Sequence, residues 1–243
     1  MKDREEKSML GIIGAMDVEI NILIDLMKTQ DNFEKKESGG LTFYAGLISG
    51  VDVVVVKSGV GKVNAALCAL RLILEYNVSS IINTGIAGAI ARGLGIFDMV
   101  VSTDAVYHDM DAVAFGYNPT EIPQMKVSAF PADEDMIKKA KAAFASLKNE
   151  RNNKMIEGRI ATGDQFISSR DVKNNIIDVC DPACVEMEGA AIAHTCFLNN
   201  VPYIILRCMS DMAEEDHEKV YVFNETEAAK QSAAVVIELL KNI

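Results

Sequence analysis

Strand-like and helix-like segments alternate along almost the whole chain, and no linker rich in serine, glycine or proline separates them. The apolar runs that we expect to form strands are Met9–Gly14, Leu41–Gly46, Val51–Val56, Ser80–Asn83, Met99–Ser102, Gly158–Thr162 and Val201–Leu206. Helical periodicity marks Val18–Met27, Val63–Tyr76, Asp133–Leu147 and Ala190–Leu198, and a capping-box pattern predicts a last helix from Asn224. The alternation predicts an α/β fold, and 243 residues without a linker favour one domain over two.

Composition excludes several classes of function. The net charge of −11 argues against nucleic acid and anionic membrane surfaces as partners, because both require a basic face. No apolar run approaches the ~20 residues of a membrane span, and residues 1–8 form a short charged extension unlike a signal peptide. The chain has an odd number of cysteines, mostly in apolar surroundings, which indicates buried thiols and a reducing cytoplasm. They are Cys68, Cys180, Cys184, Cys196 and Cys208.

Two stretches near the C-terminus contain most of the chemically useful side chains. Residues 185–191 (Val-Glu-Met-Glu-Gly-Ala-Ala) precede one predicted helix, and residues 207–211 (Arg-Cys-Met-Ser-Asp) follow a predicted strand. Ligands of open α/β sheets bind at such strand ends. Glu186 and Glu188 fit a ligand with hydroxyls and a flat ring, but they also fit a helix start, where carboxylates complement the dipole. Spacing alone leaves both interpretations open.

Two glycine-containing turns resemble phosphate-binding loops without matching them. The turn after Gly14 lacks the G-x-G-x-x-G spacing of dinucleotide-binding folds, and residues 57–62 lack the spacing of a P-loop. Free amides at the helix after residue 62 suit an anion, yet a tight turn explains the same sequence. Glu19 lies in the first turn of its predicted helix. It either complements the helix dipole or acts as a catalytic base.

Metal binding has little support in the sequence. His108 is followed by Asp109 and Asp111, and Cys180 is close to Cys184, but no second group of ligand spacing accompanies either. We expect neither a metal nor a cofactor.

The remaining segments are predicted to be loops. Small residues at 84–89 allow close approach to the backbone, residues 107–117 form a polar loop with aromatics, and residues 163–169 form an extended loop. The acidic run 212–218 is most simply a solvated loop.

Seven of these segments together resemble the 5′-methylthioadenosine/S-adenosylhomocysteine nucleosidases, a family of the purine nucleoside phosphorylase and uridine phosphorylase superfamily. The resemblance runs in unbroken order from about Leu10 to Leu240 and implies a homodimer. It also implies a single α/β domain whose mixed, twisted sheet is partly closed into a barrel and surrounded by helices. The matching segments are 11–19, 57–63, 83–88, 107–117, 163–167, 185–194 and 210–213.

The resemblance implies a role for each catalytic side chain. Asp211, oriented by Ser210, would protonate the purine so that it leaves without a full negative charge. The ribose then becomes oxocarbenium-like, and Glu19, helped by Arg207, would activate the attacking water. Glu188 would accept hydrogen bonds from the ribose hydroxyls.

The implied substrate-binding residues surround sugar, base and tail. Met187 and Phe166 would pack on the sugar and the purine, and the backbone around Ile167 would contact the adenine edge. Residues implied to line the pocket for the alkylthio tail are Met16, Val60 and Tyr221, and the rest of the implied binding set is Glu186, Ile86 and Ala87.

The superfamily also contains phosphorylases. Asn83 and Ile86 stand where those enzymes place an arginine and a serine or threonine around phosphate, and Glu19 would repel it, so hydrolysis is favoured. Ile86 is also a departure from the nucleosidases, which often have serine there. Three alternatives stay open: a phosphorylase, a hydrolase of another adenine nucleoside such as aminodeoxyfutalosine, and a nucleoside-binding protein without activity.

Overall fold

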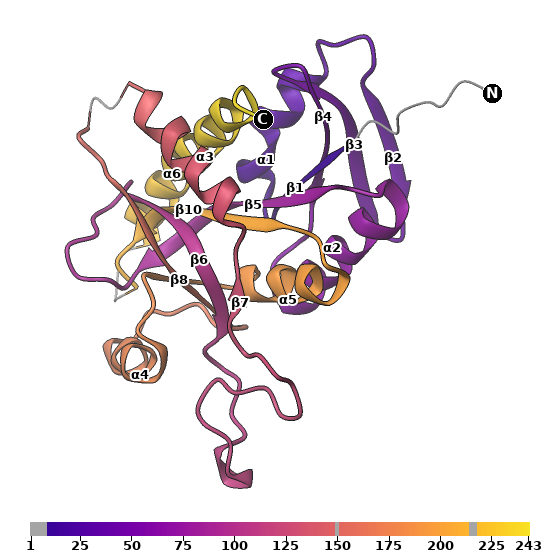
Figure 1. Ribbon diagram of the computed structural model, residues 1–243. Coiled ribbons are helices and arrows are strands. Elements are labelled where there is room, and N and C mark those ends of the chain that lie inside the picture. Colours follow the sequence, from indigo (N-terminus) through magenta and orange to yellow (C-terminus); the bar gives the residue numbers. More distant parts are fainter. Residues whose placement is uncertain (1–8, 149–150, 214–217) are drawn as a thin grey trace.

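The computed structural model describes residues 9–148, 151–213 and 218–243, with the backbone alone for 218–223. Its strands pair into one ten-stranded sheet within these residues (Figure 1). The strands are β1 (Leu10–Gly14), β2 (Glu34–Ser38), β3 (Leu41–Ile48), β4 (Val51–Lys57), β5 (Ser80–Ala89), β6 (Met99–Tyr107), β7 (Phe130–Pro131), β8 (Met155–Thr162), β9 (Cys184–Glu186) and β10 (Tyr203–Asp211). The helices are α1 (Asp17–Met27), α2 (Lys62–Tyr76), α3 (Glu134–Ser146), α4 (Arg170–Cys180), α5 (Gly189–Asn199) and α6 (Glu218–Leu240).

The sheet is mixed and closes on itself over half of its strands. Its order is β10-β6-β8-β9-β5-β1-β4-β3-β2, and a further parallel pairing between β10 and β5 completes a ring of β5, β10, β6, β8 and β9. β1, β4, β3 and β2 extend from this ring as an open sheet, with β1 parallel to β5 and to β4. The predicted α/β fold with a partly closed sheet is confirmed.

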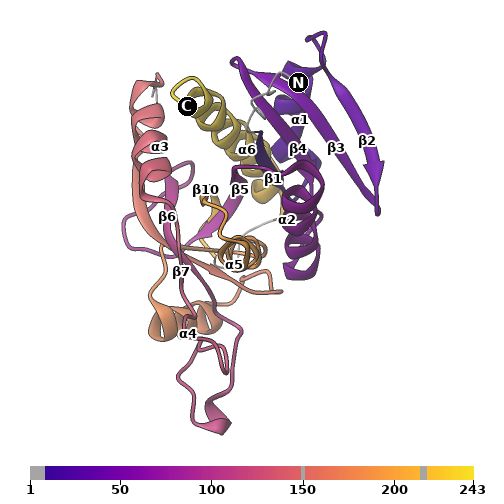
Figure 2. The same cartoon turned by 45° about the vertical axis from the view of Figure 1, so that its right-hand side comes forward.

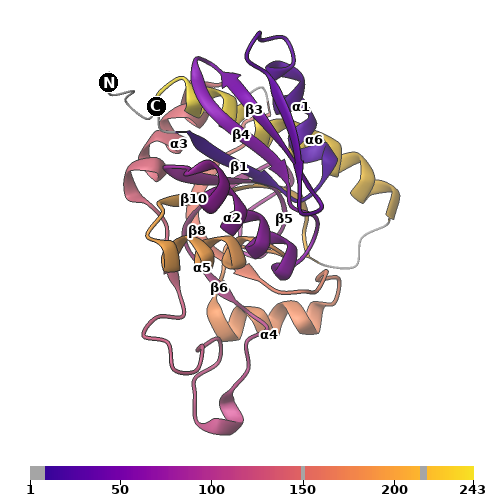
Figure 3. The ribbon, with the colours of Figure 1, turned by 90° about the vertical axis from the view of Figure 1, so that its right-hand side faces the viewer.

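Helices cover both faces of the sheet. α2 packs against α5 on one face, and α6 packs against α1 and α3 on the other (Figure 2). The buried apolar side chains form separate clusters on the two faces, as expected when a sheet lies between helical layers. The connection between β6 and β7 projects away from this body (Figure 3).

Several strands are longer than predicted, and in β5 and β10 the extra length changes where the polar side chains lie. β5 continues to Ala89 instead of ending at Asn83, and β10 continues to Asp211 instead of ending at Leu206. The two extensions pair with each other. Glycine permits this, because a side chain at Gly85 would overlap Glu19 and one at Gly88 would overlap Asp211.

Other elements were missed or misplaced. β2 consists of five polar residues, and α4 lies in a segment for which the sequence predicts no element. The prediction that the last helix begins at Asn224 is wrong, since α6 begins at Glu218. Asn224 is buried within the helix, and Glu227 pairs with Lys230 on its surface rather than closing a capping box.

Candidate active site

A cavity of about 140 Å³ opens where β1, β5, β9 and β10 end. Most residues singled out from the sequence line it: Met16, Glu19, Val60, Ile86, Ala87, Phe166, Glu186, Met187, Glu188, Ser210 and Asp211. Ala15, Gly88 and Val185 complete the lining. Three of the singled-out residues are not in the lining. Ile167 is buried in a neighbouring apolar cluster, and Arg207 is buried outside the lining. The side chain of Tyr221 lies outside the described residues.

Glu19 is held by backbone amides from two elements. One carboxylate oxygen accepts from the amides of Ala15 (2.6 Å) and Met16 (2.9 Å), and the other accepts from the amide of Ile86 in β5 (3.1 Å). Its side chain is only 4% exposed. Burial raises the pKa of Glu19, and the charge of Arg207 and the three amides oppose that rise. The site therefore contains a fixed carboxylate of increased basicity.

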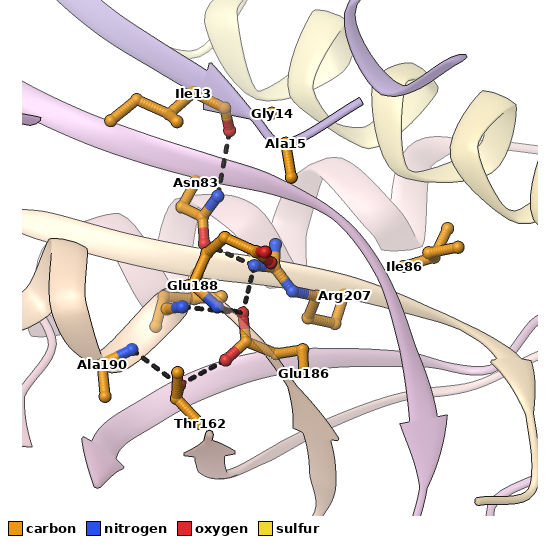
Figure 4. A network of polar contacts seen from close by, with 12 residues as sticks. Ile13, Gly14, Ala15, Asn83, Ile86, Thr162, Glu186, Glu188, Ala190 and Arg207 are labelled. Atoms are coloured by element: carbon orange, nitrogen blue, oxygen red, sulfur yellow. Dashed lines mark hydrogen bonds and ion pairs between the residues drawn. The ribbon is translucent and has the colours of Figure 1, made fainter. Parts of the chain in front are cut away.

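Arg207 is almost fully buried in β10 and pairs with Glu186. Its Nη2 donates to Glu186 Oε2 (2.5 Å) and to Asn83 Oδ1 (2.6 Å), as Figure 4 shows. Asn83 in turn donates to the carbonyl of Ile13 (3.0 Å). Within the described residues no hydrogen bond or ion pair joins Arg207 to Glu19, although both side chains approach Gly85.

Glu186 and Glu188 have different surroundings. Glu186 accepts from the amides of Glu188 (3.1 Å) and Gly189 (2.7 Å), so the helix-start interpretation describes Glu186. Glu188 turns toward the loop after β4 and accepts from the amide of Gly61 (2.8 Å). Burial, and next the charge of Glu186, raise the pKa of Glu188 to about 7.

Asp211 lies at the end of β10, beside Gly88. Its Oδ2 accepts from the hydroxyl of Ser210 (2.9 Å), and its Oδ1 accepts from the amide of Ala213 (2.8 Å). The side chain is 5% exposed. These two contacts hold the carboxyl group in one position.

The loop between β4 and α2 directs its amides toward the protein's own carboxylates. The amide of Gly61 donates to Glu188, and the amide of Lys62 donates to Asp164 (2.9 Å). Gly61 has a φ of 98°, a conformation that favours glycine. These contacts support the tight-turn interpretation over a phosphate site.

A polar brace of Lys62, Asp109 and Asp164 joins three segments of the chain. Lys62 Nζ lies 2.5 Å from Asp109 Oδ2, and the amide of Asp164 donates to the same oxygen (3.1 Å). The brace therefore links the loops that carry Val60 and Phe166. No local sequence pattern predicts the brace, because its members are 47 and 55 residues apart.

The side chains considered as metal ligands have other surroundings. The ring of His108 packs against Gly163. No group of three or more His, Cys, Asp or Glu side chains with metal-binding geometry occurs among the residues that the structure describes. All five cysteines are free and buried, which confirms the prediction of buried thiols.

Two further residues belong to the site although the sequence did not assign them to it. Asn83, considered only as a lost phosphate contact, anchors Arg207. Thr162 at the end of β8 contacts Glu186. A polar residue at the end of an apolar strand was the available signal for both.

Residues 9–241 match the family model described as the phosphorylase superfamily. The 5′-methylthioadenosine/S-adenosylhomocysteine nucleosidase of Staphylococcus carnosus is 40% identical over 236 residues, which cover 97% of this chain and 100% of that protein.

Two solved structures show the same fold. That of the Neisseria meningitidis nucleosidase in complex with methylthio-immucillin-A has a TM-score of 0.90 at 34% identity and covers 97% of this chain and 100% of its own. The futalosine hydrolase of Helicobacter pylori has a TM-score of 0.89 at 30% identity and covers 98% and 99%.

No helix in the described part of the chain is long and apolar enough to cross a membrane. The sequence and structural matches extend over nearly the whole chain. The chain belongs to the phosphorylase superfamily and, within it, to the family of the 5′-methylthioadenosine/S-adenosylhomocysteine nucleosidases.

Proposed function

We propose that this protein hydrolyses the N-ribosidic bond of 5′-methylthioadenosine and S-adenosylhomocysteine, with 5′-deoxyadenosine as a further substrate. The products are adenine and the corresponding ribose or thioribose. The observation that carries this proposal is the convergence of Glu19, Glu188 and Asp211 on one small cavity. A protein that only bound nucleosides would not need all three.

Asp211 is the proposed general acid. Donating a proton to a ring nitrogen of the purine lets the base leave neutral, which lowers the barrier to breaking the C–N bond. Ser210 and the amide of Ala213 hold the carboxyl group in place, so the proton is delivered from a fixed position. No metal is needed for this step.

Glu19 is the proposed base for water. It lies in α1, while Asp211 lies at the end of β10, so acid and base reach the cavity from different elements. Its raised pKa makes the carboxylate a better proton acceptor. As the ribose becomes oxocarbenium-like, water attacks C1′, loses its proton to Glu19 and gives the free sugar.

The remaining lining fits the nucleoside by polarity. Glu188 is proposed to accept hydrogen bonds from the ribose hydroxyls, and Met187 and Phe166 to pack on sugar and base. Met16, Val60 and Ile86 contribute apolar side chains to the lining, which suits a thioether tail.

The charges around this cavity favour water over phosphate as the nucleophile. Its lining includes four carboxylates and neither lysine nor arginine among the described residues. Arg207 is already paired with Glu186, and the nearby loop amides already bind Glu188 and Asp164. A phosphate ion would meet repulsion without a compensating cation.

The futalosine hydrolase match supports a second candidate substrate, aminodeoxyfutalosine. Its acidic tail would have to lie near Met16, Val60 and Ile86, which offer no positive charge. We therefore expect aminodeoxyfutalosine to be a poorer substrate than the thioether nucleosides.

We also propose a cytoplasmic homodimer. Five free cysteines fit a reducing compartment. α2 exposes apolar side chains on one face, among them Val63, Leu67 and Leu74, and a second copy would bury them.

The purified protein should be incubated with 5′-methylthioadenosine with and without phosphate, and the sugar product identified. We expect free methylthioribose and adenine at equal rates in both conditions. Asp211→Asn is expected to lower kcat by ~10²–10⁴ because the proton donor is lost while shape is kept. Methylthioribose 1-phosphate formed only with phosphate would overturn the hydrolase assignment, and near-normal turnover of Asp211→Asn would refute the acid.

A further inference from the structure

Thr162 lies behind the cavity rather than in its lining. It is the last residue of β8 and is fully buried. Its hydroxyl donates to Glu186 Oε1 and accepts from the amide of Ala190 in α5 (2.8 Å). Figure 4 shows this hydroxyl between the carboxylate and the first turn of α5. Both capacities of the hydroxyl are therefore used.

Glu186 connects Thr162 to the cavity. Its other oxygen accepts from the amides of Glu188 and Gly189 and from Arg207, so one carboxylate joins the start of α5 to β10. In the described residues, Thr162 is the group that donates to Oε1. Without that hydroxyl, one oxygen of a buried carboxylate would lose its partner, which is costly in a water-excluded site.

The position of the ribose-facing segment depends on this carboxylate. The backbone amide of Glu188 is held by Glu186, while its side chain reaches the loop at Gly61. Met187 lies between the two glutamates in the cavity lining. A shift of Glu186 would therefore move the groups proposed to bind the sugar, whereas Asp211, the proposed purine contact, lies on another strand.

We propose that Thr162 is a positioning residue for ribose binding, acting through Glu186 on the segment that carries Glu188. This inference rests on the proposed function, because that function identifies the ribose end of the cavity. The hydroxyl, rather than the size of the side chain, is what positions the carboxylate. Valine at position 162 should therefore weaken ribose binding, whereas serine should preserve it.

The test compares Thr162→Val with Thr162→Ser. Valine keeps the shape and removes the hydroxyl, whereas serine keeps the hydroxyl and removes a methyl group. Thr84→Val is the matched control, because Thr84 is also buried and its hydroxyl lies 2.7 Å from that of Ser232 in α6. Dissociation constants are measured by calorimetry for adenine and for a methylthio C-nucleoside, whose C–C glycosidic bond cannot be cleaved.

We expect Thr162→Val to weaken binding of the C-nucleoside by about tenfold to a hundredfold, because a displaced Glu188 would lose a charge-assisted hydrogen bond to the ribose hydroxyls. Adenine binding should change by less than about threefold. Thr162→Ser should bind both ligands nearly as the wild type does, and so should Thr84→Val. Equal losses for adenine and C-nucleoside, or no recovery with serine, would overturn the proposal.

The same experiment separates this inference from the proposed function. Wild-type protein that binds both ligands but cleaves no thionucleoside would contradict the hydrolase, while the affinity pattern of the variants would still decide the role of Thr162. Cleavage by the wild type together with full C-nucleoside affinity in Thr162→Val would contradict the positioning role alone.

Discussion

At the scale of single residues, Glu188 holds a carboxylate in a place that disfavours its charge. It is 6% exposed, and burial together with the neighbouring Glu186 raises its pKa to about 7. A carboxyl group whose pKa is higher in the folded state than in the unfolded state costs stability when it ionises. That cost is absent at low pH and is complete once the pH exceeds the folded pKa.

We therefore predict that Glu188→Gln raises the free energy of unfolding at pH of about 8, by up to roughly 2–3 kcal/mol, and leaves it nearly unchanged at pH of about 4. The glutamine oxygen can still accept from Gly61. Urea titrations at both pH values measure the difference, with the exposed Glu37→Gln as the control. A less stable Glu188→Gln at the higher pH would show that the carboxylate supports the helix start instead.

The sequence predicted which residues would meet in the site better than it predicted what each one contacts. Residues 186–188 and 210–211 line one cavity, because β9 and β10 both pair with β5 at Gly88. Spacing could not say which of Glu186 and Glu188 faces the helix amides, since both precede the same helix. Nor could it show that Arg207 pairs with Glu186, because that choice depends on how β9 and β10 are placed in the ring.

At the scale of elements, the brace of Lys62, Asp109 and Asp164 joins loops from α2, β6 and β8. Lys62 is 27% exposed and Asp109 19% exposed as side chains, so solvent screens the pair only partly. We predict that Lys62→Met raises KM for 5′-methylthioadenosine about three- to tenfold and changes kcat little, because the loops then close less readily on the substrate.

Lys57→Met is the matched control for this brace. Lys57 lies at the end of β4 and pairs with Asp17, but both side chains are largely exposed. Steady-state kinetics of the two variants should differ in KM alone. Equal kinetics would mean that the brace contributes nothing to substrate binding, and a large fall in kcat for Lys62→Met would mean that it acts on the chemical step.

Elements with strong apolar periodicity were predicted correctly, and those defined by pairing were not. α3 spans 134–146 against the predicted 133–147, because its apolar face and the cap at Asp133 are local signals. β2 is charged and exposed, and only its pairing with β3 makes it a strand. The far ends of β5 and β10 likewise exist because each supplies the hydrogen-bonding partner of the other.

At the scale of the molecule, the ring of five strands explains why residues from distant parts of the chain share one cavity. β1 and β10 both pair in parallel with β5, so their carboxyl ends lie together. Glu19 follows the first strand and Asp211 ends the last, 192 positions later. Closure of the sheet by β10 and β5 therefore assembles the site, and no local sequence pattern encodes that closure.

The exposed apolar face of α2 predicts how the whole molecule assembles. Val63, Leu67 and Leu74 are 70%, 55% and 72% exposed on one face of α2, and apolar residues at such spacing form a continuous stripe along a helix. A stripe of this kind is expected to be buried in an interface. We predict a dimer by sedimentation velocity at micromolar concentration and a monomer for the double variant Leu67→Glu/Leu74→Glu.

Leu26→Glu is the control for that experiment, because Leu26 is also exposed but lies on α1, whose helix packs with the cluster on the opposite face of the sheet. It should remain dimeric, since a charge placed away from the interface does not oppose association. Circular dichroism of both variants checks that the fold is intact. A folded double variant that still dimerises would place the interface elsewhere, and a monomeric wild type would contradict the homodimer.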